Sequence, residues 1–130
     1  MRKIIFRGKR VDNGEWVYGN LNYGTIEIKS IKDSYYISDF DVNPWDKKFY
    51  PVIPESVGQY TGLTDKNGKK IFEGDIIVIN TFEKGKTKKF RVEFDDGIFG
   101  IRLSANAYDS TIIPLRSFDY IEIIKGEEND

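Results

Sequence analysis

A tight-turn motif near the middle of the chain, Asp65-Lys66-Asn67-Gly68, constrains the fold more than any other feature of the sequence. Asn and Gly both accept the positive backbone φ angles that the tightest hairpin turns require. The flanking runs, 57–64 and 69–72, contain Val, Tyr, Thr, Ile and Phe, which favour strands. The motif therefore predicts a β-hairpin, and Gly74 permits a second bend into the run that follows it.

The same turn chemistry recurs along the chain and indicates a mainly β fold. Asp12-Asn13-Gly14, Asp33-Ser34 and Asp95-Asp96-Gly97 each separate two runs of strand-forming residues. Ile76-Ile-Val-Ile79 is apolar at every position, which predicts a central strand. No segment shows helical periodicity over ten residues. The predicted strands are 2–10, 16–23, 25–31, 35–37, 57–64, 69–72, 76–79, 90–94, 98–103 and 119–124.

The order of these segments predicts two β modules. Residues 1–54 form an N-terminal antiparallel hairpin or meander, and residues 55–125 have the segment order of a five-stranded SH3-like barrel. The stretch 38–54 mixes Pro and Asp with aromatic residues, so we expect an ordered, extended connector with at most one short helix. The charged tail, 126–130, is expected to fray.

Composition restricts the chemistry that is available to the chain. Its 130 residues contain no His and no Cys, which excludes a Ser-His-Asp triad, a Cys nucleophile and an ordinary zinc site. The formal net charge of −1 gives no global attraction to nucleic acid or to an anionic membrane. The amino terminus lacks the long apolar run of a signal peptide. We therefore expect a cytoplasmic protein that is not an enzyme and needs no cofactor.

Two stretches carry a resemblance to a known family. They are Phe6-Arg-Gly-Lys-Arg-Val11 followed by Gly14-Glu-Trp-Val-Tyr-Gly19, and the longer run Glu55–Ile77 that contains the central turn. In these positions the chain resembles the YopX family of phage and prophage proteins of Gram-positive bacteria. The resemblance implies a small, phage-encoded, β-rich protein. It implies no activity and no catalytic residues, because the family has no established biochemical function.

Aromatic residues provide the main argument for a binding function. They make up 15% of the chain, which exceeds what one small core needs. Packing between the two modules is one explanation for the excess, and a patch for a protein partner or for self-association is the alternative. The predicted partner-binding residues are Trp45, Phe49 and Tyr50.

A lysine-rich segment offers an alternative function, weak nucleic-acid binding. Barrels of this size bind phosphate through basic loops and exposed aromatic rings. The nearby Glu83, Glu93 and Asp95 cancel much of the positive field, and lysines beside an edge strand also prevent edge-to-edge aggregation. The residues of this alternative phosphate site are Lys84, Lys86, Lys88, Lys89 and Arg91.

Acidic clusters are the remaining candidates, and local turn chemistry explains each of them. Asp65 begins a stretch that vaguely matches a calcium loop, but the twelfth position is Ile76 where a Glu is required. Asp95 and Asp96 occupy a hairpin tip, and Asx-turns account for Asp in loops. A further group with oxygen ligands for a divalent cation is Asp39, Asp41, Asn43 and Asp46.

Overall fold

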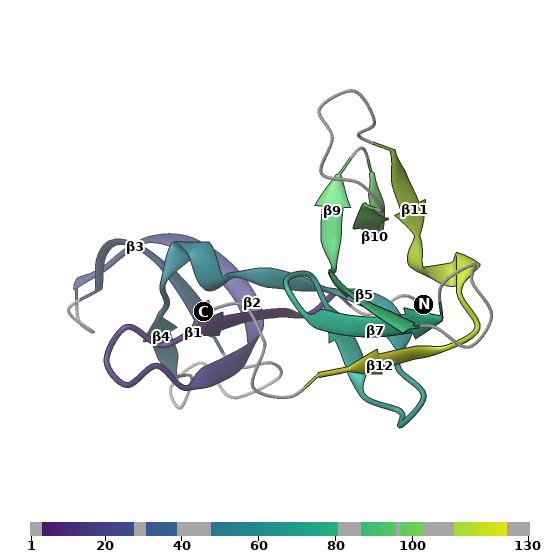
Figure 1. The fold of residues 1–130 in the computed structure, drawn as a ribbon. Helices are drawn as coiled ribbons and strands as arrows, with labels where there is room; N and C mark the ends of the chain where they lie inside the picture. Colours follow the sequence, from purple (N-terminus) through teal and green to yellow (C-terminus); the bar gives the residue numbers. More distant parts are fainter. Residues whose placement is uncertain are drawn as a thin grey trace. The chain divides into compact units, whose positions relative to one another are not determined.

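Figure 1 shows the computed structural model of the chain. It describes residues 4–27, 31–38, 48–80, 87–95, 97–102 and 111–124. The chain divides into two compact units, Met1–Tyr60 and Thr61–Asp130. The described secondary structure consists of β-strands and short 3-10 helices, which confirms the prediction of a mainly β fold.

Consecutive antiparallel strands form the sheet of the first unit. The bounds are β1 (Phe6–Lys9), β2 (Trp16–Ile26), β3 (Ile31–Ser38), β4 (Phe49–Pro51) and β5 (Gly58–Thr64). The order is β4-β3-β2-β1, and the first residues of β5 pair with the free side of β1. Asn13-Gly14 makes the first hairpin as predicted, because Gly14 adopts a φ of 74° and its N–H donates to the Arg10 carbonyl at 2.9 Å.

The hairpin formed by β2 and β3 differs from the predicted pattern and contains a β-bulge. β2 continues to Ile26, so the predicted strand 25–31 and the predicted turn at Asp33-Ser34 are wrong. The register instead shifts between Gly24 and Ile26, and Asp33 adopts a φ of 43° inside β3. The Asp33 N–H donates to the Thr25 Oγ1 at 3.0 Å. The turn-prone Asp is therefore used to bend a strand and not to reverse the chain.

The segment after β4 returns to β1 and ends in the 3-10 turn η2 (Pro54–Ser56). Val52 forms an isolated bridge with Arg10, and the Ile53 N–H donates to the Lys9 carbonyl at 2.9 Å. These bonds satisfy backbone groups that would otherwise be left at the edge of the sheet. The described part of the predicted connector is therefore ordered and extended.

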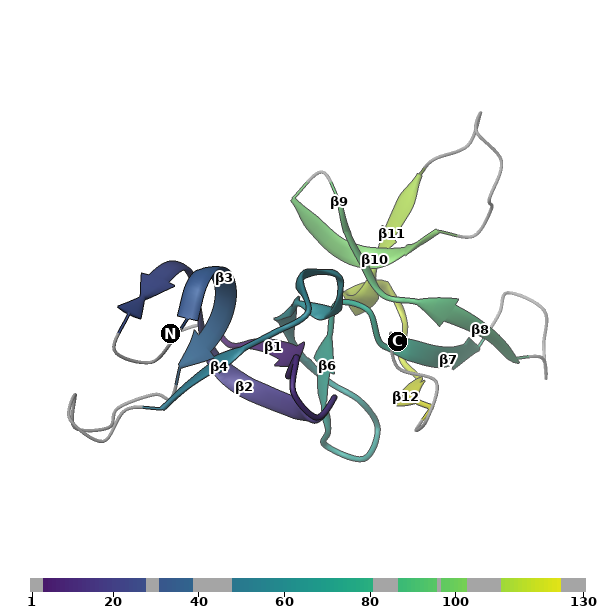
Figure 2. The same cartoon turned by 90° about the vertical axis from the view of Figure 1, so that its left-hand side faces the viewer.

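Most described strands of the second unit belong to two three-stranded antiparallel sheets. The bounds are β6 (Lys70–Phe72), β7 (Ile76–Asn80), β8 (Thr87–Arg91), β9 (Glu93–Asp95), β10 (Ile98–Arg102), β11 (Ile112–Pro114), η3 (Leu115–Ser117) and β12 (Ile121–Ile123). The sheet orders are β12-β7-β8 and β11-β10-β9 (Figure 2), and β5 enters this unit beside β6. β7 lies between two strands, which confirms the predicted central strand.

Val92 separates the two sheets at the point where β8 ends and β9 begins. Its N–H donates to the Asp75 carbonyl, and its own carbonyl accepts the Gly74 N–H, each at 2.8 Å. The predicted continuous strand 90–94 is therefore divided, with one half in each sheet. Because the described strands form sheets that do not close on themselves, the predicted SH3-like barrel is not confirmed.

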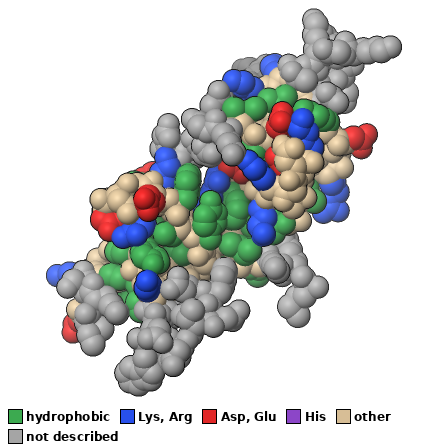
Figure 3. Space-filling model, turned by 90° about the horizontal axis from the view of Figure 1, so that it is seen from below, with side chains coloured by type: hydrophobic (Ala, Val, Ile, Leu, Met, Phe, Trp, Pro, Cys, Tyr) green, Lys and Arg blue, Asp and Glu red, His purple; other side chains and the backbone are tan. Residues whose placement is uncertain are grey.

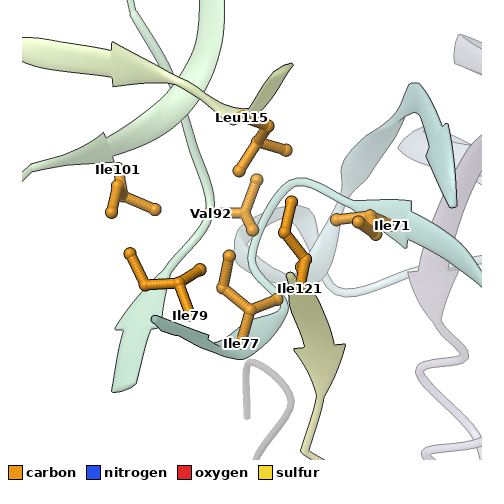
Figure 4. Packing of buried hydrophobic residues seen from close by; sticks show 7 residues of the cluster. All are labelled: Ile71, Ile77, Ile79, Val92, Ile101, Leu115 and Ile121. Atoms are coloured by element: carbon orange, nitrogen blue, oxygen red, sulfur yellow. The ribbon is translucent and has the colours of Figure 1, made fainter. Parts of the chain in front are cut away.

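One hydrophobic core serves both sheets of the second unit. Its members come from β6, β7, β10, η3, β12 and the corner between β8 and β9, and Figure 4 shows their side chains pointing into a common interior. Burial of such an aliphatic side chain contributes about 1.5–3 kcal/mol. The buried residues are Ile71, Ile77, Ile79, Val92, Ile101, Leu115 and Ile121.

Replacement of Gly100 with Ala should destabilise the chain by about 1–3 kcal/mol. A Cβ at this position in β10 would overlap the carbonyl oxygen of Ile113, so β10 and β11 would have to move apart. Chemical denaturation followed by far-UV circular dichroism measures the change. Gly97→Asn is the matched control, because Gly97 has a φ of 75° and open space around it, which Asn tolerates. Equal denaturation midpoints for Gly100→Ala and the wild type would contradict the close approach.

Candidate binding surface

The predicted partner-binding residues take part in packing where the structure describes them. Phe49 and Tyr50 are consecutive in β4, so their side chains lie on opposite faces of the sheet. Phe49 packs edge-on against Tyr36, with ring centroids 5.6 Å apart. The Arg10 guanidinium lies over the Tyr50 ring, 4.7 Å from its centroid. Both aromatic residues are half-buried and make no shared patch, and Trp45 lies outside the described residues.

Arg10 is itself held in place by the turn that follows β1. Its Nη2 and Nε donate to the two carboxylate oxygens of Asp12 at 2.6 Å and 2.9 Å. This side-chain hydrogen bonding lowers the pKa of Asp12 below its ordinary value. The fork geometry fixes the plane of the guanidinium, which then covers Tyr50. Tyr50 therefore has a packing role in the first unit.

A different aromatic pair, Tyr23 and Tyr35, is exposed on the surface of the first unit. The two residues are direct cross-strand partners in β2 and β3, with ring centroids 4.8 Å apart. Tyr23 is 63% exposed and Tyr35 is 42% exposed, although each ring covers part of the other. Their neighbours on the same face, Leu21 and Ile37, form the next cross-strand pair, and Ile37 is fully buried. We call Tyr23 and Tyr35 the tyrosine pair.

Both tyrosines are visible in the sequence, but the strand and turn patterns do not predict that they pack together. The predicted chain reversal at Asp33-Ser34 separated them into strands that were not adjacent. The observed bulge near Gly24 sets the register that brings the rings together. Only the register between β2 and β3 identifies the pair. The bulge that sets this register contains the hydrogen bond from the Asp33 N–H to the Thr25 Oγ1.

The opposite face of the sheet carries a more enclosed arrangement on β1 and β2. Arg7 is buried, and its guanidinium lies 4.3 Å from the centre of the Trp16 ring. Lys9 approaches the same ring, with its Nζ 5.3 Å from the centroid. Tyr18, the cross-strand partner of Arg7, is 51% exposed on this face. Cation–π packing therefore explains Trp16, and Tyr18 is an exposed ring on the same face as Arg7.

The predicted phosphate site is divided by the structure. Lys84 and Lys86 lie outside the described residues, and the other three cations lie on β8. Lys89 and Arg91 are opposite Val78 and Ile76 of β7, on the face of the sheet that points away from the core. Lys88 is on the other face, and its Nζ is 5.6 Å from the centre of the Phe90 ring. The described cations therefore do not form one basic patch.

Acidic side chains further reduce the positive field of this sheet. Glu122 of β12 is opposite Val78 and shares the outer face with Lys89, and its Oε2 is 3.3 Å from the Lys66 Nζ. On the face of the molecule drawn in Figure 3, Lys and Arg side chains lie among acidic and apolar side chains. A phosphate chain would meet both signs of charge on this face.

The predicted acidic sites contain no metal-binding group in the part of the chain that the structure describes. Asp95 is ion-paired with Arg102, which also contacts Glu93 at 3.3 Å. Asp96 lies outside the described residues, as does the cluster formed by Asp39, Asp41, Asn43 and Asp46.

Asp65 has a structural role that extends beyond its own turn. Its Oδ1 accepts the N–H groups of Asn67 and Lys69 at 2.8 Å and 3.0 Å, and Gly68 has the predicted positive φ of 80°. Its Oδ2 accepts the Ile123 N–H of β12 at 3.1 Å, a contact that no local pattern predicts. Burial raises the pKa of Asp65, but these three backbone donors outweigh that effect and lower it below the ordinary 3.8.

Comparison with known proteins places this chain in a family. The features above define a small, mainly β protein whose candidate site is a set of exposed aromatic and charged side chains. The family model described as "YopX protein" matches residues 5–124, and the chain therefore belongs to the YopX family. No curated protein matches the chain. None of the described helices is long and apolar enough to cross a membrane.

One similar solved structure is the crystal structure of protein EF1440 from Enterococcus faecalis. It is 22% identical to this chain, with 95% of this chain and 92% of that chain covered and a TM-score of 0.48. At this level of similarity the neighbour carries no argument about function.

Asp65→Asn should cost about 1–3 kcal/mol of stability at neutral pH, because one amide group cannot accept all three N–H groups. The pKa of Asp65 is lowered in the folded state. Its contribution is therefore present above the ordinary value of 3.8 and is lost as pH falls through the folded-state pKa. Denaturation curves measured from neutral pH into this acid range should show a shallower pH dependence for the variant. Asp119→Asn, an exposed residue of the same unit, should match the wild type. A variant as stable as the wild type would contradict the role of the carboxylate.

Proposed function

We propose that this chain is a non-enzymatic accessory protein of a phage or prophage, which binds a protein partner in the host cytoplasm through the tyrosine pair. The observation that carries the proposal is the exposure of two adjacent rings, 63% and 42%, at the surface of a hydrogen-bonded sheet. Aromatic residues of this kind dominate the energetics of protein interfaces.

The local structure prepares the tyrosine pair for binding. Both residues lie on regular parts of β2 and β3, and the buried Ile37 supports the next position of the same face. Two rings that already pack against each other lose little side-chain entropy when a partner covers them. Each ring also keeps a hydroxyl group for a hydrogen bond at the rim of an interface.

The remaining chemistry supports binding in preference to catalysis. The sequence has no His and no Cys from which to build a nucleophile–base pair. The carboxylates of Asp65 and Asp75 are buried and accept backbone N–H groups. Asp65 accepts the Ile123 N–H, and Asp75 accepts the Phe72 N–H at 2.8 Å. Their hydrogen bonding serves the fold of the second unit.

Replacing both tyrosines tests the proposal. We expect immobilised wild-type protein to capture a partner from a Gram-positive host lysate, and Tyr23→Ser/Tyr35→Ser to bind that partner at least about tenfold more weakly, since aromatic anchors contribute about 2 kcal/mol or more. Purified partner and isothermal titration give the affinities. Tyr18→Ser is the matched control, because Tyr18 is similarly exposed on the opposite face.

The solution mass of the same variants distinguishes a second copy from another protein. A wild-type dimer that becomes monomeric in Tyr23→Ser/Tyr35→Ser would identify the partner as the chain itself. Equal partner affinities for the wild type and the double variant, with both folded by circular dichroism, would contradict the proposal.

A further inference from the structure

The turn between β1 and β2 contains Asn13-Gly14, one of the two Asn-Gly pairs in the sequence. Asn13, Gly14 and Glu15 are all exposed. The Glu15 N–H donates to the Asn13 Oδ1 at 2.9 Å. Because this hydrogen bond spans Gly14, it draws the side-chain carbonyl of Asn13 back along the backbone that links Asn13 to Glu15.

The arrangement favours attack of the Gly14 nitrogen on the side-chain carbonyl carbon of Asn13. Nucleophile and carbonyl belong to the same short stretch of chain, and their bond closes a small ring, so the reaction needs no encounter between two molecules. A donor on the carbonyl oxygen polarises the carbonyl group and stabilises the oxyanion that attack creates. Gly14 has no Cβ, and open space surrounds the position that a Cβ would occupy, so the side chain approaches without hindrance.

The second Asn-Gly pair, Asn67-Gly68, is also exposed and provides an internal comparison. Gly14 and Gly68 have similar φ angles of 74° and 80°. Each glycine N–H donates to a carbonyl of its own turn, at 2.9 Å to Arg10 and at 3.0 Å to Asp65. In both turns a local opening therefore has to precede attack by the glycine nitrogen.

The two pairs differ in the N–H group that lies two residues after the asparagine. At the first pair, the Glu15 N–H donates to the asparagine side chain itself. At the second pair, the corresponding Lys69 N–H donates to the Asp65 Oδ1 at 3.0 Å. The Asp65 carboxylate thus takes the donor that would polarise the Asn67 amide, whereas the Asn13 amide receives it.

We propose that Asn13 is a site of spontaneous deamidation, which converts it to aspartate or isoaspartate faster than Asn67 is converted. The Gly14 nitrogen loses its proton to solvent and bonds to the Asn13 Cγ. The bond between Cγ and Nδ2 then breaks, and Nδ2 takes up a proton and leaves as ammonia. Water adds to one of the two carbonyl carbons of the cyclic imide and breaks its bond to the Gly14 nitrogen. Opening at Cγ gives aspartate, and opening at the backbone carbonyl gives isoaspartate.

Either product changes the turn that supports Tyr50. Both products place a new carboxylate beside Asp12, which holds the Arg10 guanidinium over the Tyr50 ring. The new carboxylate competes with Asp12 for that guanidinium. Isoaspartate also adds a backbone atom to the turn that sets the register of β1 against β2. The site is separate from the tyrosine pair, and the proposal does not rest on the proposed function.

Timed mass spectrometry of the full chain tests the proposal. The native protein is incubated at mildly alkaline pH, and proteolytic peptides that contain Asn13 or Asn67 are followed for conversion of the amide to the acid. Enzymatic methylation of isoaspartyl groups identifies the isomer. We expect Asn13 to convert severalfold faster than Asn67. In denaturant the two rates should become similar, because the hydrogen bonds that distinguish the two turns are lost.

Two substitutions at Glu15 isolate the backbone donor. Glu15→Pro removes the N–H and should slow the conversion of Asn13 severalfold, towards the rate of Asn67. Glu15→Gln is the matched control, because it keeps the N–H and removes only the carboxylate, and it should convert at the wild-type rate. Circular dichroism checks the fold of each variant. If Glu15→Pro does not fold, the native and denatured rates of the wild type decide the question.

The proposal is overturned if Asn67 converts as fast as Asn13 in the native protein, or if denaturant leaves the ratio of the two rates unchanged. It is also overturned if a folded Glu15→Pro variant converts at the wild-type rate, or if Glu15→Gln slows conversion as much as Glu15→Pro does.

Discussion

The backbone hydrogen bonds between the Gly74-Asp75 turn and Val92 are the constraint on which the second unit depends. They hold the chain at the point where it leaves one sheet and enters the other. Asp75 is almost fully buried there, and its Oδ2 also accepts the Phe72 N–H, so the turn is fixed from both sides. Because the corner residue is itself part of the core, the two sheets share one set of aliphatic side chains. The corner therefore lets both three-stranded sheets bury their apolar faces in the same core.

The Asp65 carboxylate performs a related task at a distance along the sequence. It closes its own turn through Asn67 and Lys69, and it also holds the last strand, β12, through the Ile123 N–H. A backbone bond between the Lys66 N–H and the Ile121 carbonyl at 2.9 Å strengthens the same contact. One buried anion thus joins a local hairpin to a strand that lies more than fifty residues further along the chain. Buried carboxylates of this kind stabilise folds when backbone donors satisfy them, and they then have little capacity left for a metal ion.

The surface proposed for binding and the division of the basic residues follow from strand geometry in the same way. A bulge sets the register of β2 and β3 and thereby brings Tyr23 and Tyr35 side by side. The two-residue alternation of β8 separates Lys88 from Lys89 and Arg91. In each case the chemistry of the side chains is visible in the sequence, but their grouping is created by register.

The sequence by itself determined the class of fold, the family and the positions of the tightest turns. Asn13-Gly14 and Asn67-Gly68 were predictable because few residues accept positive φ. The apolar run predicted that β7 lies between two other strands, although its Ile76 and Val78 face outward and are only half-buried. The tertiary structure alone decided the bulge at Asp33, the corner at Val92 and the contact between Asp65 and Ile123. Each of these depends on a hydrogen bond to a residue that is distant in the sequence or lies in another strand, and strand-forming patterns do not specify which partner a backbone group will find. Because strand register is not visible in the sequence, the sequence predicted Phe49 and Tyr50 as binding residues. The exposed tyrosine pair was recognised only in the folded structure.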